Sequence, residues 1–257
     1  MQIQDQLGRT IELKNTPKRI ISLVPSQTEL LVDLGLQDSI VGITHYCVHP
    51  ASLKELKTSV GGTKKVNFRK VKDLEPDIIL CNKEENTREM VKELEKIAPV
   101  HVSDVATLDD AYHLMLDYGI IFSCSPLAST MVNSLKKKSE NLKELVANSP
   151  EKNVAYFIWN KPLMVAGQGT FINEMLKLNR FHNVFDVERY PETDLEDLKN
   201  KDIDICLLSS EPFPFSEEHK ALFKNVAREV KIVDGEYFSW YGSRLLEAMD
   251  YFKQFHS

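Results

Sequence analysis

Long hydrophobic runs are absent from this sequence of 257 residues. The longest uninterrupted apolar run, Val154–Trp159, has six residues, whereas a helix that crosses a bilayer needs about 20. The first residues carry several charges and no signal-peptide pattern, so we expect the chain as given to be soluble and without an export signal. Two localisations then stay open: the cytoplasm, or the periplasm or cell envelope if a leader has been removed.

Basic clusters and cysteine motifs are also scarce. The net charge is −6, and no basic block is longer than the three lysines at 136–138, so we expect no nucleic-acid partner. The chain has four cysteines, which are scattered and form no CxxC motif. This spacing argues against a disulfide framework. The cysteines are Cys47, Cys81, Cys124 and Cys206.

Short β-type runs alternate with helical runs along most of the chain, a pattern typical of α/β proteins. Ser26 and Glu29 have the spacing of a capping box, which predicts a helix that begins at Ser26. The other predicted helices cover 68–74, 86–97, 108–116, 170–178, 195–200, 217–223 and 242–255. The predicted strands cover 20–24, 40–43, 77–81, 100–102, 154–158, 203–208 and 231–233.

One predicted helix is much longer than the others. Residues 127–148 contain no glycine or proline, and their leucines recur on a single helical stripe. At about 1.5 Å rise per residue, such a helix spans about 33 Å. We therefore predict two α/β lobes, residues 1–125 and 150–257, each with a mostly parallel sheet flanked by helices, and an interlobe helix within 126–149.

Two stretches carry a resemblance to a known family. RIISLVPSQTELLVDLGLQDSIVGITHY (19–46) and PLMVAGQGTFINEMLKLNRFHNVF (162–185) resemble the helical-backbone periplasmic binding proteins. These are the soluble receptors of ATP-binding cassette (ABC) importers for vitamin B12, haem and iron–siderophore complexes. The resemblance runs from about Leu7 to Phe255, and the segments SQTE and THY make it greatest for the corrinoid receptors.

The resemblance implies a non-enzymatic, monomeric solute-binding protein that captures a corrinoid or related metal chelate between two lobes and delivers it to an ABC importer permease. It also implies that the long helix allows only a small closure on binding. The alternatives are a haem or iron–siderophore receptor and a cytosolic corrinoid-handling protein that reuses the fold. No GxSxG motif or Ser/His/Asp set indicates an enzyme.

Ligands of open α/β sheets bind at loops that follow the carboxyl ends of the strands. Aromatic residues are concentrated in these loops, and a flat, mostly apolar macrocycle needs broad apolar walls. Packing of the same aromatics in the core is the alternative. The candidate ligand-binding residues are Ser26, Tyr46, Thr63, Trp159, Tyr190, Glu236, Tyr237 and Trp240.

The resemblance assigns roles to some of these positions. Tyr46 matches an aromatic residue that lines the ligand cleft of corrinoid receptors, and Tyr190 falls where they commonly have a tryptophan. Glu236 and Tyr237 fall at an acidic and an aromatic position. The sequence departs from the family where Thr63 and Asn82 replace aromatic residues, and where Trp240 replaces an arginine.

The resemblance also implies docking through one glutamate on each lobe, which meets arginines of the permease. Glu196 matches the second-lobe position, whereas Arg69 stands at the first-lobe position and reverses its charge. Asp73 or Glu75 could substitute there. A solvated carboxylate in the first turn of a helix is the alternative for Glu196.

Two further motifs need an interpretation. His45 and His49 in HYCVH could ligate a metal from one face of a helix, but the segment follows a predicted strand, so we expect a loop. A single histidine of this loop could still ligate the iron or cobalt of a bound chelate, and a hydrogen-bonded loop histidine is the alternative. The turn 167–170 lacks the lysine of a P-loop, and we expect Thr170 to cap the next helix. We therefore predict no metal site and no cofactor.

Overall fold

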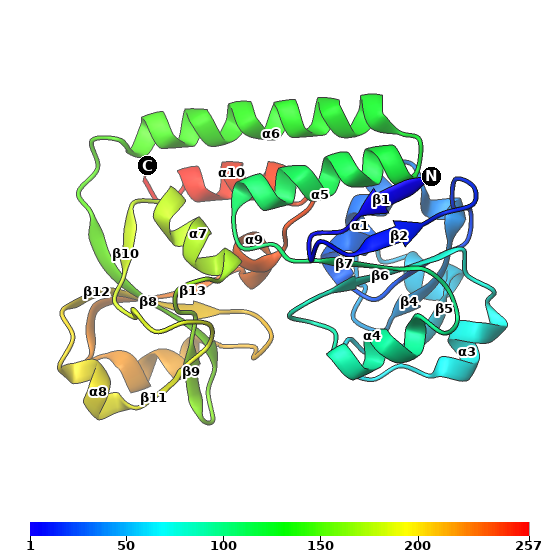
Figure 1. Cartoon of the computed structure of the whole chain (residues 1–257). Helices are drawn as coiled ribbons and strands as arrows, with labels where there is room; N and C mark the ends of the chain where they lie inside the picture. Colours follow the sequence, from blue (N-terminus) through cyan, green and yellow to red (C-terminus); the bar gives the residue numbers. More distant parts are fainter. Residues whose placement is uncertain (257) are drawn as a thin grey trace. The chain divides into compact units, whose positions relative to one another are not determined.

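The structure, a computed structural model, describes residues Met1–His256 (Figure 1). The chain divides into two compact units that interleave along the sequence. None of the helices in this described part is both long and apolar enough to span a bilayer. Unit 1 consists of Met1–Val105, Asp109–Ser134 and Tyr241–Arg244, and unit 2 of Ala106–Leu108, Leu135–Trp240 and the residues from Leu245 on.

Unit 1 is built on a five-stranded parallel sheet in the order β5-β4-β3-β6-β7. Its strands are β3 (Ile20–Ser22), β4 (Ile40–Thr44), β5 (Thr58–Gly61), β6 (Ile78–Asn82) and β7 (Val100–Ser103). Its helices are α1 (Pro25–Asp33), a 3₁₀ turn η1 (Gln37–Ser39), α2 (Leu53–Leu56), α3 (Phe68–Asp73), α4 (Arg88–Leu94) and α5 (Leu108–Ile121), whose first residue belongs to unit 2.

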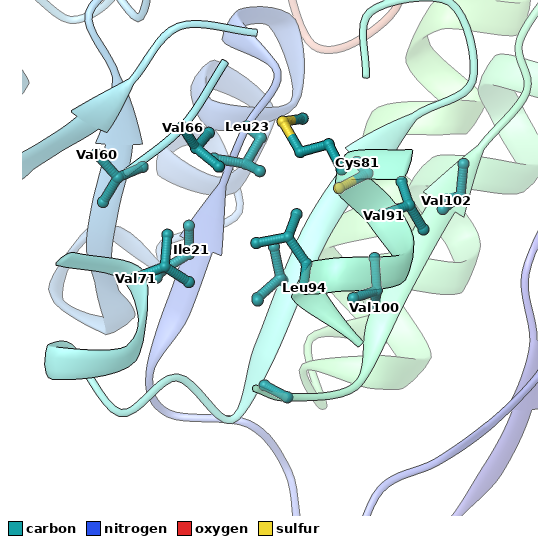
Figure 2. Close-up of a cluster of buried hydrophobic side chains, with 13 residues drawn as sticks. Ile21, Leu23, Val60, Val66, Val71, Cys81, Val91, Leu94, Val100 and Val102 are labelled. Carbon is teal, nitrogen blue, oxygen red and sulfur yellow. The ribbon is translucent and has the colours of Figure 1, made fainter. Parts of the chain in front are cut away.

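Side chains alternate between the two faces of the sheet, and those on one face pack against α3 and α4. Ile21, Cys81 and Val102 share a buried cluster with Val71 of α3 and Leu94 of α4 (Figure 2). Successive strand residues point to opposite faces of a sheet. The residues between cluster members therefore face the other side, where α1 and α5 pack.

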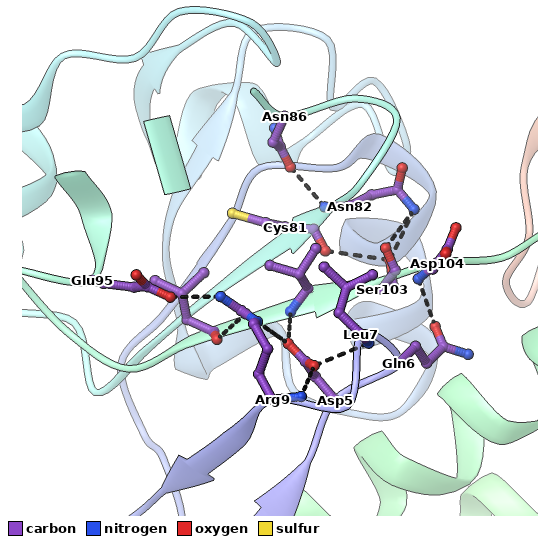
Figure 3. A network of polar contacts seen from close by, with 12 residues as sticks. Asp5, Gln6, Leu7, Arg9, Cys81, Asn82, Asn86, Glu95, Ser103 and Asp104 are labelled. Carbon is purple, nitrogen blue, oxygen red and sulfur yellow. Dashed lines mark hydrogen bonds and ion pairs between the residues drawn. The ribbon is translucent and has the colours of Figure 1, made fainter. Parts of the chain in front are cut away.

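A two-stranded antiparallel hairpin precedes this sheet. It consists of β1 (Gln2–Gln4) and β2 (Thr10–Glu12). The buried Asp5 in its turn accepts hydrogen bonds from the backbone N–H groups of Arg9 and Val102 and from the Arg9 guanidinium (Figure 3). Arg9 also pairs with Glu95 at 2.5 Å. One carboxylate thus attaches the hairpin to the edge strand β7.

The long helix predicted around 127–148 is confirmed. α6 (Ser125–Val146) is one uninterrupted helix, whose residues up to Ser134 belong to unit 1 and whose residues from Leu135 belong to unit 2. Pro126 lies inside its first turn rather than before it. Proline is tolerated there because an N–H group of the first turn has no partner within the helix.

Unit 2 contains a second sheet in the order β11-β9-β8-β12-β13, and β10 also pairs with β8. β8, β12, β13 and β10 are parallel, whereas β9 runs antiparallel to β8. The strands are β8 (Lys152–Trp159), β9 (Leu163–Val165), β10 (Phe181–Asn183), β11 (Glu192–Thr193), β12 (Ile203–Ser209) and β13 (Ala227–Val233). The remaining elements are α7 (Phe171–Leu178), α8 (Leu195–Lys199), a 3₁₀ helix η2 (Glu217–Phe223), α9 (Gly235–Ser239) and α10 (Leu245–Lys253).

The predicted start of α1 is wrong. The helix begins at Pro25 with Val24 as its N-cap, and no side chain caps it. The Oγ of Ser26 is buried without a hydrogen-bond partner among the described residues. Glu29 does not reach back to Ser26, because its carboxylate pairs with Arg244.

The predicted C-terminal helix 242–255 is confirmed with shorter bounds as α10, and the short helix α9 before it was not predicted. α9 ends at Ser239, α10 begins at Leu245, and the segment Tyr241–Arg244 between them belongs to unit 1. By contrast, Thr170 caps α7 as predicted, since its hydroxyl accepts a hydrogen bond from Asn173 N–H at 3.2 Å.

A buried histidine makes the stability of unit 1 depend on pH. His101 of β7 is fully buried, and neither ring nitrogen has a hydrogen-bond partner among the described residues. Its ring contacts Tyr118 of α5, with the ring centroids 5.5 Å apart. Burial lowers the pKa of His101 from 6.5 to about 4, because the charged ring cannot be hydrated there.

We expect the free energy of unfolding to fall as the pH drops from about 6.5 to about 4. Over this range the unfolded chain binds a proton at His101 that the folded chain does not, and the loss approaches about 3 kcal/mol. Urea unfolding at pH 7.5 and 4.5 measures it. His101→Leu should abolish this part of the loss, and His182→Gln, at an exposed histidine, should keep it. An unchanged pH dependence in His101→Leu would contradict the expectation.

Candidate functional site

The carboxyl edge of the unit 1 sheet brings several predicted site residues together. β3, β4, β5 and β6 are parallel, so the loops that follow them leave the sheet on the same side. Tyr46 follows β4, Thr63 follows β5 and Asn82 ends β6. Asn86 links two of these loops, because its side-chain N–H donates to the Thr63 carbonyl oxygen at 2.7 Å.

Asn82 has a structural role at this edge. Its side-chain oxygen Oδ1 accepts hydrogen bonds from Glu84 N–H at 2.8 Å and Glu85 N–H at 3.2 Å. Its backbone N–H donates to Asn86 Oδ1 at 2.7 Å (Figure 3). Asn82 is buried, with 2% of its surface exposed. The amide therefore shapes the loop after β6, a role that an aromatic side chain could not fill because it lacks these acceptors.

A second set of buried polar side chains lies at the same edge. Gln27 donates to Ser103 Oγ at 2.6 Å and accepts from the Tyr118 hydroxyl at 2.7 Å. Tyr241 interacts with both Gln27 and Ser103. These contacts hold α1, β7, α5 and the segment Tyr241–Arg244 together, and none of these four residues was predicted as a site residue.

A cavity of about 770 Å³ opens beside the loops after β4 and β5. Tyr46 is 55% exposed and stacks on His45, with the ring centroids 4.1 Å apart. Gly62 lies under this pair, and a Cβ atom there would come within 3.0 Å of the His45 ring. The cavity is lined by His45, Tyr46, Ser59, Val60, Gly61, Gly62, Thr63, Lys64, Lys65, Val66, Asn67 and Lys70.

Tyr46 and Thr63 therefore line one cavity, whereas Ser26 does not. Ser26 lies in the first turn of α1 with 4% of its surface exposed, and its hydroxyl has no described hydrogen-bond partner. Its role as a ligand contact stays a prediction.

In unit 2, two predicted aromatics lie at the carboxyl edge of the sheet. Trp159 ends β8, is 38% exposed and contacts the Phe213 ring edge-on at 5.7 Å. Tyr237 of α9 follows β13 and packs on Tyr251 of α10, with the ring centroids 4.7 Å apart. Glu236 is half-buried beside it, and its backbone N–H donates to the Asp234 carboxylate at 3.0 Å.

Trp240 differs from the expected loop position with one face open to water. It is 7% exposed, and its indole N–H donates to Glu211 Oε1 at 2.9 Å. Ser239 donates to the same oxygen at 2.9 Å. Burial raises the pKa of Glu211 despite these bonds. Glu211 was not among the predicted site residues, although it follows the predicted strand 203–208.

Tyr190 lies elsewhere on the sheet. β11 pairs antiparallel with β9, which pairs antiparallel with β8, so β11 runs in the direction of β8. Tyr190 precedes β11 and therefore lies on the amino side of that strand. It is half-buried, and the structure does not place it in the group formed by Trp159 and Tyr237.

The docking candidate Glu196 and the charge-reversed Arg69 are both exposed. Glu196 lies in the first turn of α8, which Asp194 caps, and forms an ion pair with Lys199 at 2.6 Å. Arg69 on α3 has a 91% exposed side chain, 3.9 Å from Asp73. Glu196 is thus a solvated carboxylate in the first turn of a helix, which is the alternative to docking given above. Its docking role stays a prediction.

The histidine motif forms a loop after β4, as predicted. Within the described residues, no three His, Cys, Asp or Glu side chains gather in a way that could hold a metal ion. Cys47 is buried between Thr28 and Thr44, at 3.1 and 3.3 Å from their hydroxyls, and burial raises the pKa of its thiol. All four cysteines are free.

Residues 20–229 match the model of a family described as periplasmic binding protein. An uncharacterised ABC transporter substrate-binding lipoprotein, YvrC of Bacillus subtilis, is 29% identical over 68% of this chain and 58% of its own length. A vitamin B12-binding protein of Pectobacterium carotovorum is 22% identical over 90% of this chain and 86% of that protein. The match thus spans less than two thirds of the first relative.

Solved structures share the fold. The periplasmic vitamin B12 binding protein BtuF of Vibrio cholerae superposes with a TM-score of 0.81 at 22% identity, over 93% of this chain and 96% of that one. A periplasmic heme binding protein from Pseudomonas aeruginosa has a TM-score of 0.79 at 21% identity, over 93% and 92% of the two chains.

A structure named for an ABC-type Fe³⁺-hydroxamate transport system, from Saccharomonospora viridis, has a TM-score of 0.78 at 19% identity, over 99% and 98% of the two chains. At these identities the structures establish the α/β fold of this chain and leave its ligand open. The family model covers most of the sequence, from the start of β3 through α6 to the first residues of β13, and the chain therefore belongs to the periplasmic binding protein family.

Proposed function

We propose that this chain is a solute-binding protein of an ABC importer that binds a corrinoid or related metal chelate. The observation that carries the proposal is the cavity of unit 1 at the carboxyl edge of its parallel sheet, with the exposed ring of Tyr46 at its mouth. Its volume lies within the range of about 300–1,000 Å³ that is usual for small-molecule sites. Two of the relatives and structures compared above are named for vitamin B12 binding.

The residues at this edge suit a flat, largely apolar ligand. Tyr46 offers a broad apolar face and a polar tip, and Thr63 adds a small polar group beside it. The Asn86 contact holds the Thr63 carbonyl in place, so the loop keeps its shape without the ligand.

A haem or iron–siderophore ligand is the second candidate. The heme-binding and Fe³⁺-hydroxamate structures have the same fold with nearly the same TM-score. This chain also departs from the corrinoid pattern at Thr63 and Trp240. Neither ligand class calls for an enzymatic role, and we propose none.

The proposed partner is the permease of an ABC importer, and Glu196 is the proposed contact on unit 2. The relative from Bacillus subtilis is named as a substrate-binding lipoprotein of such a transporter. The proposed localisation is the periplasm or the cell envelope, and the proposed oligomeric state is a monomer.

Titration with metal chelates tests the function. Cyanocobalamin, dicyanocobinamide, haemin and ferrioxamine are each added to the purified chain, and binding is followed by absorbance and by isothermal titration calorimetry. One of the four should bind with one molecule per chain at micromolar concentration. If none of them gives heat or a spectral change at that concentration, the proposed function is wrong.

Tyr46→Ala should weaken binding of whichever chelate binds by about 5- to 150-fold. Loss of a large apolar contact corresponds to about 1–3 kcal/mol, and about 1.4 kcal/mol is tenfold in affinity. The melting temperature should hardly change, because the side chain is already 55% exposed. Phe68→Ala is the matched control, since Phe68 is 39% exposed and does not line the cavity. Equal effects of the two variants on affinity would contradict the assignment.

A further inference from the structure

The lining of the unit 1 cavity is positively charged, although the protein as a whole is negatively charged. The chain as a whole carries a net charge of −6, yet Lys64, Lys65 and Lys70 all line this one cavity. None of the described residues that line it is acidic. Three cations around a small volume, without an opposing carboxylate in the lining, attract anions.

Two of the three lysines are oriented by backbone contacts. The Lys64 ammonium donates to the Glu84 carbonyl oxygen, and the Lys70 ammonium donates to the Ser59 carbonyl oxygen at 3.3 Å. Each ammonium has three N–H groups. One bond to a carbonyl therefore leaves donors free for a ligand and restricts where the charge can go.

The surrounding backbone keeps the cavity open at this point. Gly62 N–H donates to the Lys65 carbonyl oxygen at 2.8 Å, which closes the tight turn that carries both Lys64 and Lys65. Gly61 has a φ of +133°, and a Cβ atom there would lie 2.6 Å from the Lys65 carbonyl oxygen. Glycine is therefore needed at this position for the turn to present both lysines beside Tyr46.

We propose that this cavity binds an anionic group of the ligand, a phosphate or a carboxylate, through the ammonium groups of Lys64, Lys65 and Lys70. The proposal rests on the proposed function and defines it further, because it selects chelates that carry such a group. The Tyr46 ring contacts the apolar part of the chelate, and the lysines contact its charged edge. A cationic or neutral chelate without an anionic group gains nothing from these lysines.

The test compares ligand pairs that differ in the anionic group. Cyanocobalamin contains a phosphodiester, and dicyanocobinamide lacks it. Haemin has two propionate carboxylates, and its dimethyl ester has none. The variant is Lys64→Gln/Lys65→Gln/Lys70→Gln, which changes only exposed side chains. Lys72→Gln is the control, because Lys72 is on the same helix as Lys70 but does not line the cavity.

The triple variant should bind the anionic member of the preferred pair about 30-fold more weakly, at about threefold for each exposed lysine. The other member should change less than twofold, and Lys72→Gln should leave both unchanged. Raising NaCl from 50 to 500 mM should weaken only the anionic member, because salt screens exposed charges. Equal losses for both members, or no loss for either, would overturn the proposal. The pair that responds identifies the anion as phosphate or carboxylate.

Pyrophosphate is a probe that does not depend on the proposed function. At millimolar concentration it should shift the backbone amide resonances of Gly62 and Thr63 in the unmodified chain and not in the triple variant. This shift would support the anion site even if no chelate binds, which would refute only the proposed function. Absence of the shift in the unmodified chain would refute the anion site even if a chelate binds.

Discussion

Arg244→Ala should lower the free energy of unfolding of unit 1 by up to about 3–5 kcal/mol, the cost of leaving one member of a fully buried ion pair without its partner, because this pair is largely buried. The Arg244 and Glu29 side chains are 11% and 14% exposed. The Arg244 guanidinium donates two hydrogen bonds to the Glu29 carboxylate, one from Nε to Oε2 at 2.9 Å and one from a terminal nitrogen to Oε1. Arg244 holds the segment Tyr241–Arg244 against α1, so its loss also frees that segment.

The pH dependence of this loss identifies its cause. Burial raises the pKa of Glu29, and the hydrogen bond and charge of Arg244 oppose the rise. Without Arg244 the folded-state pKa should rise further above the unfolded value. A raised carboxyl pKa destabilises the fold increasingly as the pH rises through that interval. The deficit of Arg244→Ala should therefore be larger at pH 8 than at pH 5.

Urea unfolding of two further variants separates the buried charge from lost packing. Glu29→Gln/Arg244→Ala should recover most of the loss, because a neutral amide replaces the unpaired carboxylate. Arg228→Ala should cost at most about 1 kcal/mol, since the Arg228 side chain is 71% exposed and pairs with Asp202 and Asp204 at the surface. A double variant as unstable as Arg244→Ala would show that packing, not charge, dominates.

Asp5→Ala should cost unit 1 about 3–5 kcal/mol as well. The Asp5 side chain is fully buried and accepts hydrogen bonds from the N–H groups of Leu7, Arg9 and Val102 at 3.0–3.1 Å. It also pairs with the Arg9 guanidinium at 2.6 Å. Removing the carboxylate takes the acceptor from the three backbone N–H groups, whereas the Arg9 guanidinium keeps its contacts with Glu95 and the Val100 carbonyl oxygen. The contact between the Asp5 side chain and β7 is then lost.

Hydrogen exchange measures this effect locally. The amide of Val102 should lose most of its protection in Asp5→Ala, and amides of β12 in unit 2 should keep theirs. Asp5→Asn should recover only part of the stability, because its one side-chain oxygen can replace either Oδ1, which accepts from the Leu7 and Arg9 N–H groups, or Oδ2, which accepts from the Val102 N–H group, but not both. Asp73→Ala is the surface control, with Asp73 68% exposed and 3.9 Å from Arg69. Full protection of Val102 in Asp5→Ala would show that the hairpin does not depend on this carboxylate.

Much of the fold was predictable because its signals are local. The stripe of α6 recurs every three or four residues, and the cap of Thr170 on Asn173 spans three. The buried strand Ile78–Asn82 is an apolar run bounded by a proline. The short strands β9 and β11, of three and two residues, were missed. They are too short for any periodicity, and only their partners in the sheet make them strands.

The candidate site was predictable only in outline. The rule that ligands bind after the carboxyl ends of parallel strands selected the loops of Tyr46 and Thr63, which do share a cavity. It could not tell that Trp240 packs against Glu211, 29 residues away, instead of standing open to water. Which face of an aromatic residue is covered depends on neighbours from distant parts of the chain, and composition does not name them.

The sequence alone determined the α/β class, the long helix and the family, because each depends on patterns that extend over short or contiguous stretches. Only the tertiary structure decided which charges meet. Glu29 and Arg244 are 215 residues apart in the sequence, and this spacing alone does not bring their side chains into contact. Likewise, Lys70 joins Lys64 and Lys65 around one cavity because α3 folds back beside β5. Long-range contacts of this kind follow from the packing of whole elements, and no local spacing encodes them.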